Sequence, residues 1–163
     1  MPPDPTIQDA QLVSSRPVMD INAIQQVTQD FRILKHLLMA LVLDRKAQVV
    51  LEVGTDVGDS TRVFSSCLQL TGGKLYTIDK EPPKQNWLES WPIKNVLFTL
   101  GDSITVPWGE PLDLLFLDGD HTAEHLRKEL DYFARRVKVG GRVALHDTCH
   151  NEFGQEITGL VLV

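Results

Sequence analysis

The sequence predicts an α/β fold in which a doubly wound, mostly parallel sheet carries helices on both faces. Short apolar runs alternate with helical segments along the chain, as repeated βαβ units require. Polar residues follow each predicted strand. Because right-handed crossovers place the carboxyl ends of parallel strands at one edge of the sheet, we expect these polar residues to meet there and to form a ligand site.

Size and charge narrow the classes of partner. The chain has 163 residues, enough for one domain with a substantial core. Its net charge of -6 argues against nucleic acid, because phosphate binding needs clustered Lys and Arg. The longest apolar run, residues 37–43, is far shorter than the ~20 residues that span a bilayer. No secretory signal pattern opens the chain. We therefore expect a cytoplasmic protein that binds a small molecule, and neither nucleic acid nor membrane.

The chain divides into an arm and a domain. Residues 1–17 are rich in proline, which predicts a flexible N-terminal arm. Residues 18–163 are expected to form a single domain. It opens with an amphipathic helix over residues 20–44, where apolar residues recur at three- and four-residue steps.

Glycines, prolines and capping residues set the expected element boundaries. Asp59, Ser60 or Thr61 can cap the helix after the first strand, and Gly72–Gly73 can end it. A short helix is expected around Trp87. A later helix should begin after Thr122 and stop at Gly140–Gly141. The predicted strands are residues 49–53, 75–79, 96–100, 112–118 and 142–146, with a further short strand within 157–163.

The turn after the first strand is a candidate ligand site. Gly54 and Gly58 let the backbone pass close to a ligand, and the following helix would aim its N–H groups at that ligand. The dinucleotide pattern GxGxxG is absent, because Asp56 stands at its second glycine and a carboxylate there would repel a pyrophosphate. This argues against a nucleotide-dependent oxidoreductase. Asp79, at the end of the second strand, is placed to accept both hydroxyls of a ribose.

Four motifs in order resemble the class I S-adenosylmethionine-dependent methyltransferases, which have a Rossmann-like fold. They are E-x-G-x-x-x-G-x-S-T at residues 52–61, Gly-Asp-Ser at 101–103, Asp-Gly-Asp-His at 118–121, and G-G-x-x-x-x-H-D-T at 140–148. Within this class, the sequence most resembles the small-molecule O-methyltransferases of methyltransferase family 24 and of the macrocin and catechol O-methyltransferase type. It covers about residues 49–148.

The resemblance implies a set of residues that bind S-adenosylmethionine. Residues of the glycine turn would line the methionine part, Asp79 would hold the ribose, and Asp102 and Ser103 would lie beside the adenine. The full expected set is Glu52, Gly54, Thr55, Asp56, Gly58, Ser60, Asp79, Lys80, Gly101, Asp102, Ser103 and Asp118.

Methyl transfer to a hydroxyl also needs a base, and His121, His146 and Asp118 are the candidates at the predicted edge. We favour the two histidines, because a neutral imidazole is available near pH 7. Three other histidines, His36, His125 and His150, are interpreted as surface or helix residues. Some relatives bind Mg²⁺, and Asp118 and Asp147 fit that layout, but His146 or Thr148 at the remaining place departs from an acid followed by Asn.

The segment after the fifth strand is short for this family, so its C-terminal hairpin is expected to be short or missing. Either the chain is a fragment, or residues 157–163 or a second subunit in a homodimer cover the sheet edge. The function that the sequence favours is O-methylation of a small hydroxylated molecule. The alternative is a non-catalytic domain with the same fold that binds the cofactor or a partner.

Overall fold

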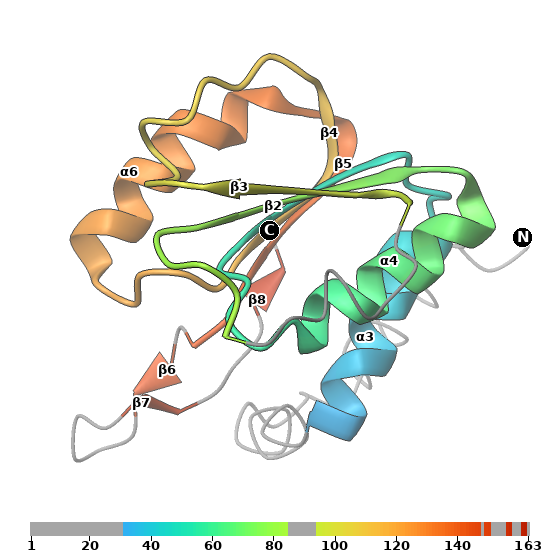
Figure 1. Cartoon of the computed structure of the whole chain (residues 1–163), viewed down its shortest axis with the longest axis horizontal. Helices are drawn as coiled ribbons and strands as arrows, with labels where there is room; N and C mark the ends of the chain where they lie inside the picture. The colour runs from blue at the N-terminus through green and yellow to red at the C-terminus, as the bar shows by residue number, and fades with distance from the viewer. Residues whose placement is uncertain (1–30, 85–93, 148, 151–155, 158–160, 163) are drawn as a thin grey trace, which may run out of the picture.

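The computed structural model describes residues 31–84, 94–147, 149–150, 156–157 and 161–162. Their main feature is a 6-stranded sheet in the order β3-β2-β1-β4-β5-β8 (Figure 1). This confirms the predicted α/β fold. The strands are β1 (Val49–Val53), β2 (Lys74–Asp79), β3 (Val96–Leu100), β4 (Leu112–Leu117), β5 (Val137–Leu145) and β8 (Val161–Leu162). The predicted arm at residues 1–17, the first part of the helix at 20–44 and the segment around Trp87 lie outside the described residues.

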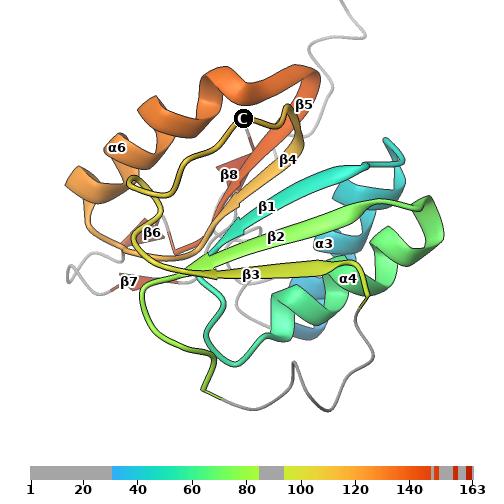
Figure 2. The ribbon, with the colours of Figure 1, turned by 45° about the horizontal axis from the view of Figure 1, so that its top comes forward.

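The order of the strands places a crevice at the middle of the sheet. Strands β1 to β5 pair in parallel, and the chain runs outward from β1 through β2 to β3 before it crosses back to β4 (Figure 2). The carboxyl ends of β1 and β4 therefore lie side by side, at the point where the winding reverses. Ligands bind at such a switch point in open α/β sheets.

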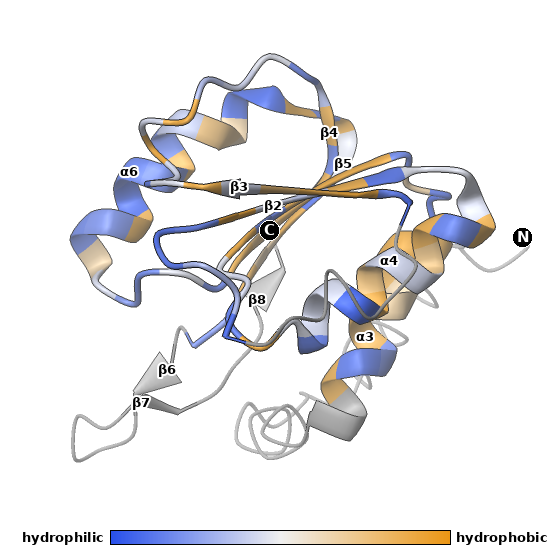
Figure 3. Ribbon diagram, viewed as in Figure 1, coloured by the Kyte–Doolittle hydropathy of each residue, from blue (hydrophilic) through white to orange (hydrophobic). Residues whose placement is uncertain are grey.

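Both faces of the sheet are covered, as predicted. Helices α3 (Phe31–Leu43) and α4 (Asp59–Thr71) pack on one face, and α6 (Ala123–Phe133) packs on the other (Figures 1 and 2). Successive strand residues alternate between the two cores: Val50 packs under α3 and α4, whereas Leu51 packs under α6. The strands are accordingly apolar along most of their length (Figure 3).

The predicted end of the helix after Thr122 and the predicted start of the fifth strand are both wrong, for one physical reason. Helix α6 ends at Phe133 and continues as the 3-10 turn η1 (Ala134–Arg136), and Gly140–Gly141 lies inside β5 rather than at a helix end. A Cβ at Gly141 would lie 2.7 Å from the Val137 side chain and 3.1 Å from the Asp113 carbonyl oxygen. These glycines thus allow an irregularity in the β4–β5 register. In the sequence, such a glycine pair resembles a signal that ends a helix.

The predicted side-chain cap of α4 is also wrong. The helix begins after Gly58, which has φ 79° and is its N-cap, with no side-chain cap hydrogen bond. The Ser60 and Thr61 hydroxyls donate instead to Glu52, at 2.6 Å each. Gly72 ends α4 in the left-handed conformation as expected, and the Thr122 hydroxyl caps α6 by accepting from the His125 N–H at 3.3 Å.

The C-terminal part contains two further pairings. Strands β6 (Cys149–His150) and β7 (Glu156–Ile157) form a separate antiparallel pair, and β8 pairs antiparallel with the end of β5. The chain's own β8 therefore lies on the sheet edge that we expected it or a second subunit to cover. None of the helices in the described ranges is long and apolar enough to cross a membrane.

The turns that follow β1 and β4 are in direct backbone contact. The Gly54 N–H donates to the Ile78 carbonyl and the Asp118 N–H to the Val53 carbonyl, both at 2.8 Å, so the ladders continue beyond the strands. Gly54 has φ +93°, and a Cβ there would lie 2.1 Å from the Asp118 carbonyl oxygen. Only glycine therefore allows these two turns to approach so closely.

Gly54→Ala is expected to destabilise the fold by more than about 3 kcal/mol, because it adds a backbone clash to a strained φ. Gly140→Ala is the matched control: Gly140 has φ +83° but nothing within 4 Å of its Cβ position. This control should cost only about 1 kcal/mol. Urea unfolding of both variants measures the difference, and equal losses would show that the close contact contributes nothing.

Glu52 is a fully buried carboxylate beneath the glycine turn. Burial raises its pKa to about 7, although hydrogen bonds from Ser60, Thr61 and Thr77 act in the opposite direction. A charged Glu52 therefore costs stability in the folded state. Its partners hold the first turn of α4 against β1.

The raised pKa of Glu52 makes the free energy of unfolding depend on pH. Between pH 4.5 and about 7 the folded chain binds this proton and the unfolded chain does not, so stability falls as pH rises through that window. Glu52→Gln should remove the effect, about 3 kcal/mol in the difference between variant and wild type. Unfolding curves at pH 5 and pH 8 measure it. A difference that is the same at both pH values would contradict a neutral Glu52.

Candidate active site

A cavity of about 570 Å³ opens at the carboxyl edge of the sheet. The loops after all five parallel strands contribute to its lining, and α6 closes one side. Among the residues predicted from the sequence, those that line it are Gly54, Asp56, Asp79, Lys80, Gly101, Ser103, Asp118, His121, His146 and Asp147. The strand order therefore brings residues from five separate loops to one cavity.

The remaining predicted residues lie around this cavity. Thr55 and Ser60 line a smaller cavity of about 160 Å³, which shares Gly54, Asp118 and His146 with the main one. Glu52 is buried beneath the turn, and Gly58 begins α4. Asp102 contacts two lining residues, Lys80 and His125.

Asp79 joins the end of β2 to the glycine turn. Its Oδ2 accepts from the N–H groups of Thr55 at 2.7 Å and Asp56 at 3.0 Å, and its Oδ1 accepts from that of Glu81 at 3.0 Å. Partial burial on its own would raise the pKa of Asp79, but these backbone bonds outweigh it and hold the pKa below its ordinary value. Asp79 is therefore a charged acceptor that faces the cavity.

Two lysines tie the loops around the cavity together. Lys80 Nζ lies 3.3 Å from Asp120 Oδ2 and 3.9 Å from Asp102 Oδ2, and so links the loops after β2, β3 and β4. Lys84 forms an ion pair with Asp56 across the turn. Without them, the carboxylates of these loops would repel one another.

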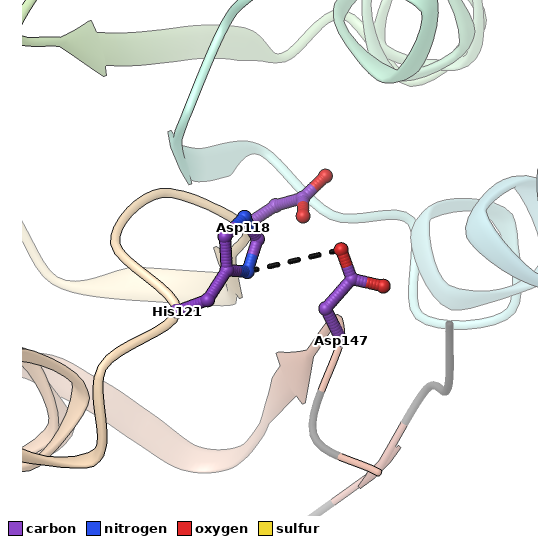
Figure 4. Close-up of side chains that lie close together, drawn as sticks. All are labelled: Asp118, His121 and Asp147. Atoms are coloured by element: carbon purple, nitrogen blue, oxygen red, sulfur yellow. Dashed lines mark ion pairs between the residues drawn. The ribbon is translucent and has the colours of Figure 1, made fainter. Parts of the chain in front are cut away.

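Two histidines and two aspartates meet between the ends of β4 and β5: Asp118, His121, His146 and Asp147, called here the histidine–aspartate cluster. His121 Nδ1 lies 3.7 Å from Asp147 Oδ2, and both side chains point toward Asp118 (Figure 4). One ligand atom each from Asp118, His121 and Asp147 lies within 4.8 Å of the others. The cluster thus combines acceptors with an imidazole at the cavity wall.

His146 is the enclosed member of this cluster. Its Nδ1 lies 2.9 Å from Asp118 Oδ1 and 3.1 Å from Asp147 Oδ1. These two short contacts do not have the angles of hydrogen bonds, and Nε2 has no hydrogen-bond partner among the residues that the structure describes. Burial opposes protonation of the ring, but the two carboxylates outweigh it and raise the pKa of His146. More of this ring is therefore protonated near neutral pH than of a free imidazole, which leaves less of it able to accept a proton.

Five charged or imidazole side chains of the cavity wall were not among the predicted site residues: Glu81, Lys84, Asp120, His125 and Glu129. The interpretation of His125 as a helix residue is correct, but only 12% of its side chain is exposed, so it is not at the surface. His125 and Glu129 stand four residues apart, and this spacing places both on one face of α6. That signal was available in the sequence beside the apolar period of the same helix.

Comparison with known proteins agrees with this architecture. A protein described as the methyltransferase PaMTH1 of Podospora anserina, solved with S-adenosylhomocysteine, aligns with a TM-score of 0.59 at 17% identity, over 89% of this chain and 71% of that one. A putative caffeoyl-CoA O-methyltransferase of Staphylococcus aureus aligns with 0.60 at 19%, over 86% and 70%. The N-methyltransferase NodS of Bradyrhizobium japonicum aligns with 0.60 at 17%, over 88% and 73%.

These structures share the fold with the chain, and the sequence shows the family. A family model described as a methyltransferase domain matches residues 51–148, from β1 to the end of the fifth strand's loop and more than half of the chain. The chain therefore belongs to this methyltransferase domain family, within the class I S-adenosylmethionine-dependent methyltransferases.

Proposed function

We propose that the protein transfers a methyl group from S-adenosylmethionine to a hydroxyl group of a small molecule. The observation that carries this proposal is the content of one cavity: the charged acceptor Asp79 and the histidine–aspartate cluster both line it. Membership of the methyltransferase family supports the reaction type. The imidazole of His121 beside the carboxylates supports a hydroxyl group as the acceptor of the methyl group, because that group has to lose a proton.

The cofactor would occupy the cavity along the strand ends. Asp79 would accept hydrogen bonds from the ribose hydroxyls, because backbone N–H groups keep it charged and it lines the cavity. Thr55 and Ser60 would lie beside the methionine part, since they line the smaller cavity that adjoins the main one. The adenine would lie at Gly101–Ser103. Asp56 and Lys80 would border the ribose from the turn and from the loop after β2.

Catalysis would depend mainly on orientation and on one proton transfer. When bound, S-adenosylmethionine supplies an electrophilic methyl group on a sulfonium that already leaves readily. His121 would remove the hydroxyl proton, because 38% of its side chain is exposed and a substrate can reach it, and Asp147 would orient its ring. Asp118 would orient the substrate hydroxyl, and the enclosed His146 would hold Asp118 in place. Fixing the oxygen in line with the methyl carbon supplies most of the rate enhancement.

Replacing Asp79 by Ala should weaken binding of S-adenosylhomocysteine by about 1 to 3 kcal/mol, the range for losing a charged hydrogen-bond partner. Asp113→Ala is the control, because Asp113 also accepts two backbone N–H bonds but lies at the opposite end of the sheet. Titration calorimetry measures both variants. Equal affinities in wild type and Asp79→Ala would remove the ribose assignment.

Replacing His121 by Ala should lower kcat by about 10²-fold or more while leaving cofactor affinity nearly unchanged, because a general base acts only in the chemical step. His36→Ala, on the exposed face of α3, should leave both quantities unchanged. Single-turnover rates and calorimetry separate the two effects. Full activity in His121→Ala would assign the base to another residue.

A divalent cation is the second role that the histidine–aspartate cluster supports, because Asp118, His121 and Asp147 offer two carboxylates and an imidazole within 4.8 Å. A bound cation would lower the pKa of a hydroxyl that it contacts. Calorimetry with Mg²⁺ and with Mn²⁺ tests this role without reference to activity. Cation binding to the wild type that is lost in Asp147→Asn would establish this role. The absence of a binding heat with either ion would contradict it.

The acceptor atom is tested by methyl transfer itself. The protein is incubated with methyl-labelled S-adenosylmethionine and matched phenols, sugars and amines, and the products are identified by mass. Labelled ethers support the proposal, and labelled amines alone would reassign it to N-methylation. Cofactor binding without any transfer would favour the alternative, a non-catalytic binding domain.

A further inference from the structure

A second polar cluster lies under α6, on the side of the cavity that this helix closes. It consists of Ser103, His125 and Glu129, called here the α6 cluster. The Ser103 hydroxyl donates to Glu129 Oε1 at 2.6 Å, and His125 Nε2 lies 3.3 Å from the same oxygen and 3.4 Å from Ser103 Oγ. All three residues line the cavity. The mechanism above uses neither His125 nor Glu129.

The burial of the Glu129 carboxylate opposes the stability of the folded state. It is 1% exposed, and burial raises its pKa in spite of the bond from Ser103 and the nearby His125. No lysine or arginine among the described residues forms a salt bridge with it. Packing of α6 does not require a carboxylate here, because Leu126, Leu130 and Phe133 already supply its apolar face. A buried acid without a cation partner suggests a role at the site.

The partners of Glu129 connect the helix to the loop after β3. Ser103 lies directly beside Asp102 in that loop. His125 Nε2 lies 3.6 Å from Asp102 Oδ1, and His125 Nδ1 lies 3.9 Å from Asp120 Oδ2. Glu129 therefore fixes Ser103 by a hydrogen bond and contacts His125, which in turn borders Asp102. Glu129 in α6 thus sets the position of the loop that would face the adenine.

The chemistry of this end of the cavity is dominated by acceptors. Three carboxylates, from Asp102, Asp120 and Glu129, surround one imidazole, and Lys80 contacts the first two but forms no salt bridge with Glu129 among the described residues. Carboxylates accept hydrogen bonds and do not donate them when ionised. Such a wall favours a nucleobase with an exocyclic amine over one with a carbonyl oxygen at the same place. The carbonyl oxygen is itself an acceptor and would face the carboxylate acceptors of the wall.

We propose that Glu129 is a positioning residue for base recognition: through Ser103 and His125 it holds the loop after β3 so that the cavity accepts a 6-aminopurine and rejects a 6-oxopurine. This inference rests on the proposed function, since it assigns the base of the cofactor to this end of the cavity. It makes α6 a specificity element in addition to a cover for the sheet.

The test compares two ligands that differ at one position of the base, S-adenosylhomocysteine and S-inosylhomocysteine, by calorimetry on the full chain. Wild type should bind the adenosyl ligand about tenfold or more tightly. Glu129→Ala should bring the ratio of the two Kd values close to one. Glu129→Gln should keep most of the ratio, because an amide oxygen can still accept from Ser103. Glu124→Gln, on the same helix but 80% exposed, is the matched control and should leave the ratio unchanged.

A purely structural role for Glu129 would weaken both ligands equally and leave the ratio unchanged, and this result would overturn the inference. If Glu129→Ala does not fold, as circular dichroism would show, Ser103→Ala breaks the same contact from the loop side and should lower the ratio in the same way. An unchanged ratio in that variant would overturn the inference as well. Failure of wild type to bind either ligand would instead refute the proposed function.

Discussion

The backbone contact between Gly54 and Asp118 is the constraint on which the site depends. A glycine at φ +93° lets the turn after β1 lie against the turn after β4, with space for no Cβ between them. The same contact sets where the Asp118 side chain begins and where the first turn of α4 starts. Because β1 and β4 are neighbours at the reversal of the winding, everything that binds at this edge has to lie over that contact.

Charge distribution gives the cavity its second property. Carboxylates from the loops after β1, β2, β4 and β5 face the same space, and Lys80 and Lys84 hold the outer ones together. Two acids at this edge show opposite shifts of pKa, each with its own cause. Backbone N–H groups hold Asp79 in its charged form, whereas burial favours the neutral form of Glu52. An acid-rich pocket with a few fixed cations suits a ligand that carries positive charge at one end and hydroxyls at the other.

The sequence predicted the fold and the gathering of the polar residues after the strands at one edge, because both depend on local patterns. Buried parallel strands are continuous apolar runs, and polar residues directly after them mark the edge. The errors concern features that depend on contacts far apart in the chain. Gly140–Gly141 resembles a helix stop, yet Gly141 packs against Val137 and Asp113 within the sheet. Ser60 and Thr61 resemble caps, but their hydroxyls donate hydrogen bonds to the buried Glu52.

His125 and Glu129 were missed for a related reason. On a helix with a clear apolar period, polar residues are normally read as the solvated face, and only the tertiary position of the loop after β3 turns this pair toward a cavity. Likewise, the sequence placed His121 and His146 on equal terms. The structure separates them, because one is open to a substrate and the other lies enclosed between two carboxylates.

The most direct test of the account is a crystal structure of the protein with S-adenosylhomocysteine. We expect the ribose on Asp79, the adenine at Gly101–Ser103 under α6, and the sulfur directed toward the histidine–aspartate cluster. A ligand bound elsewhere, or one that lies in this cavity with its sulfur turned away from Asp118, would contradict the assignment of the site.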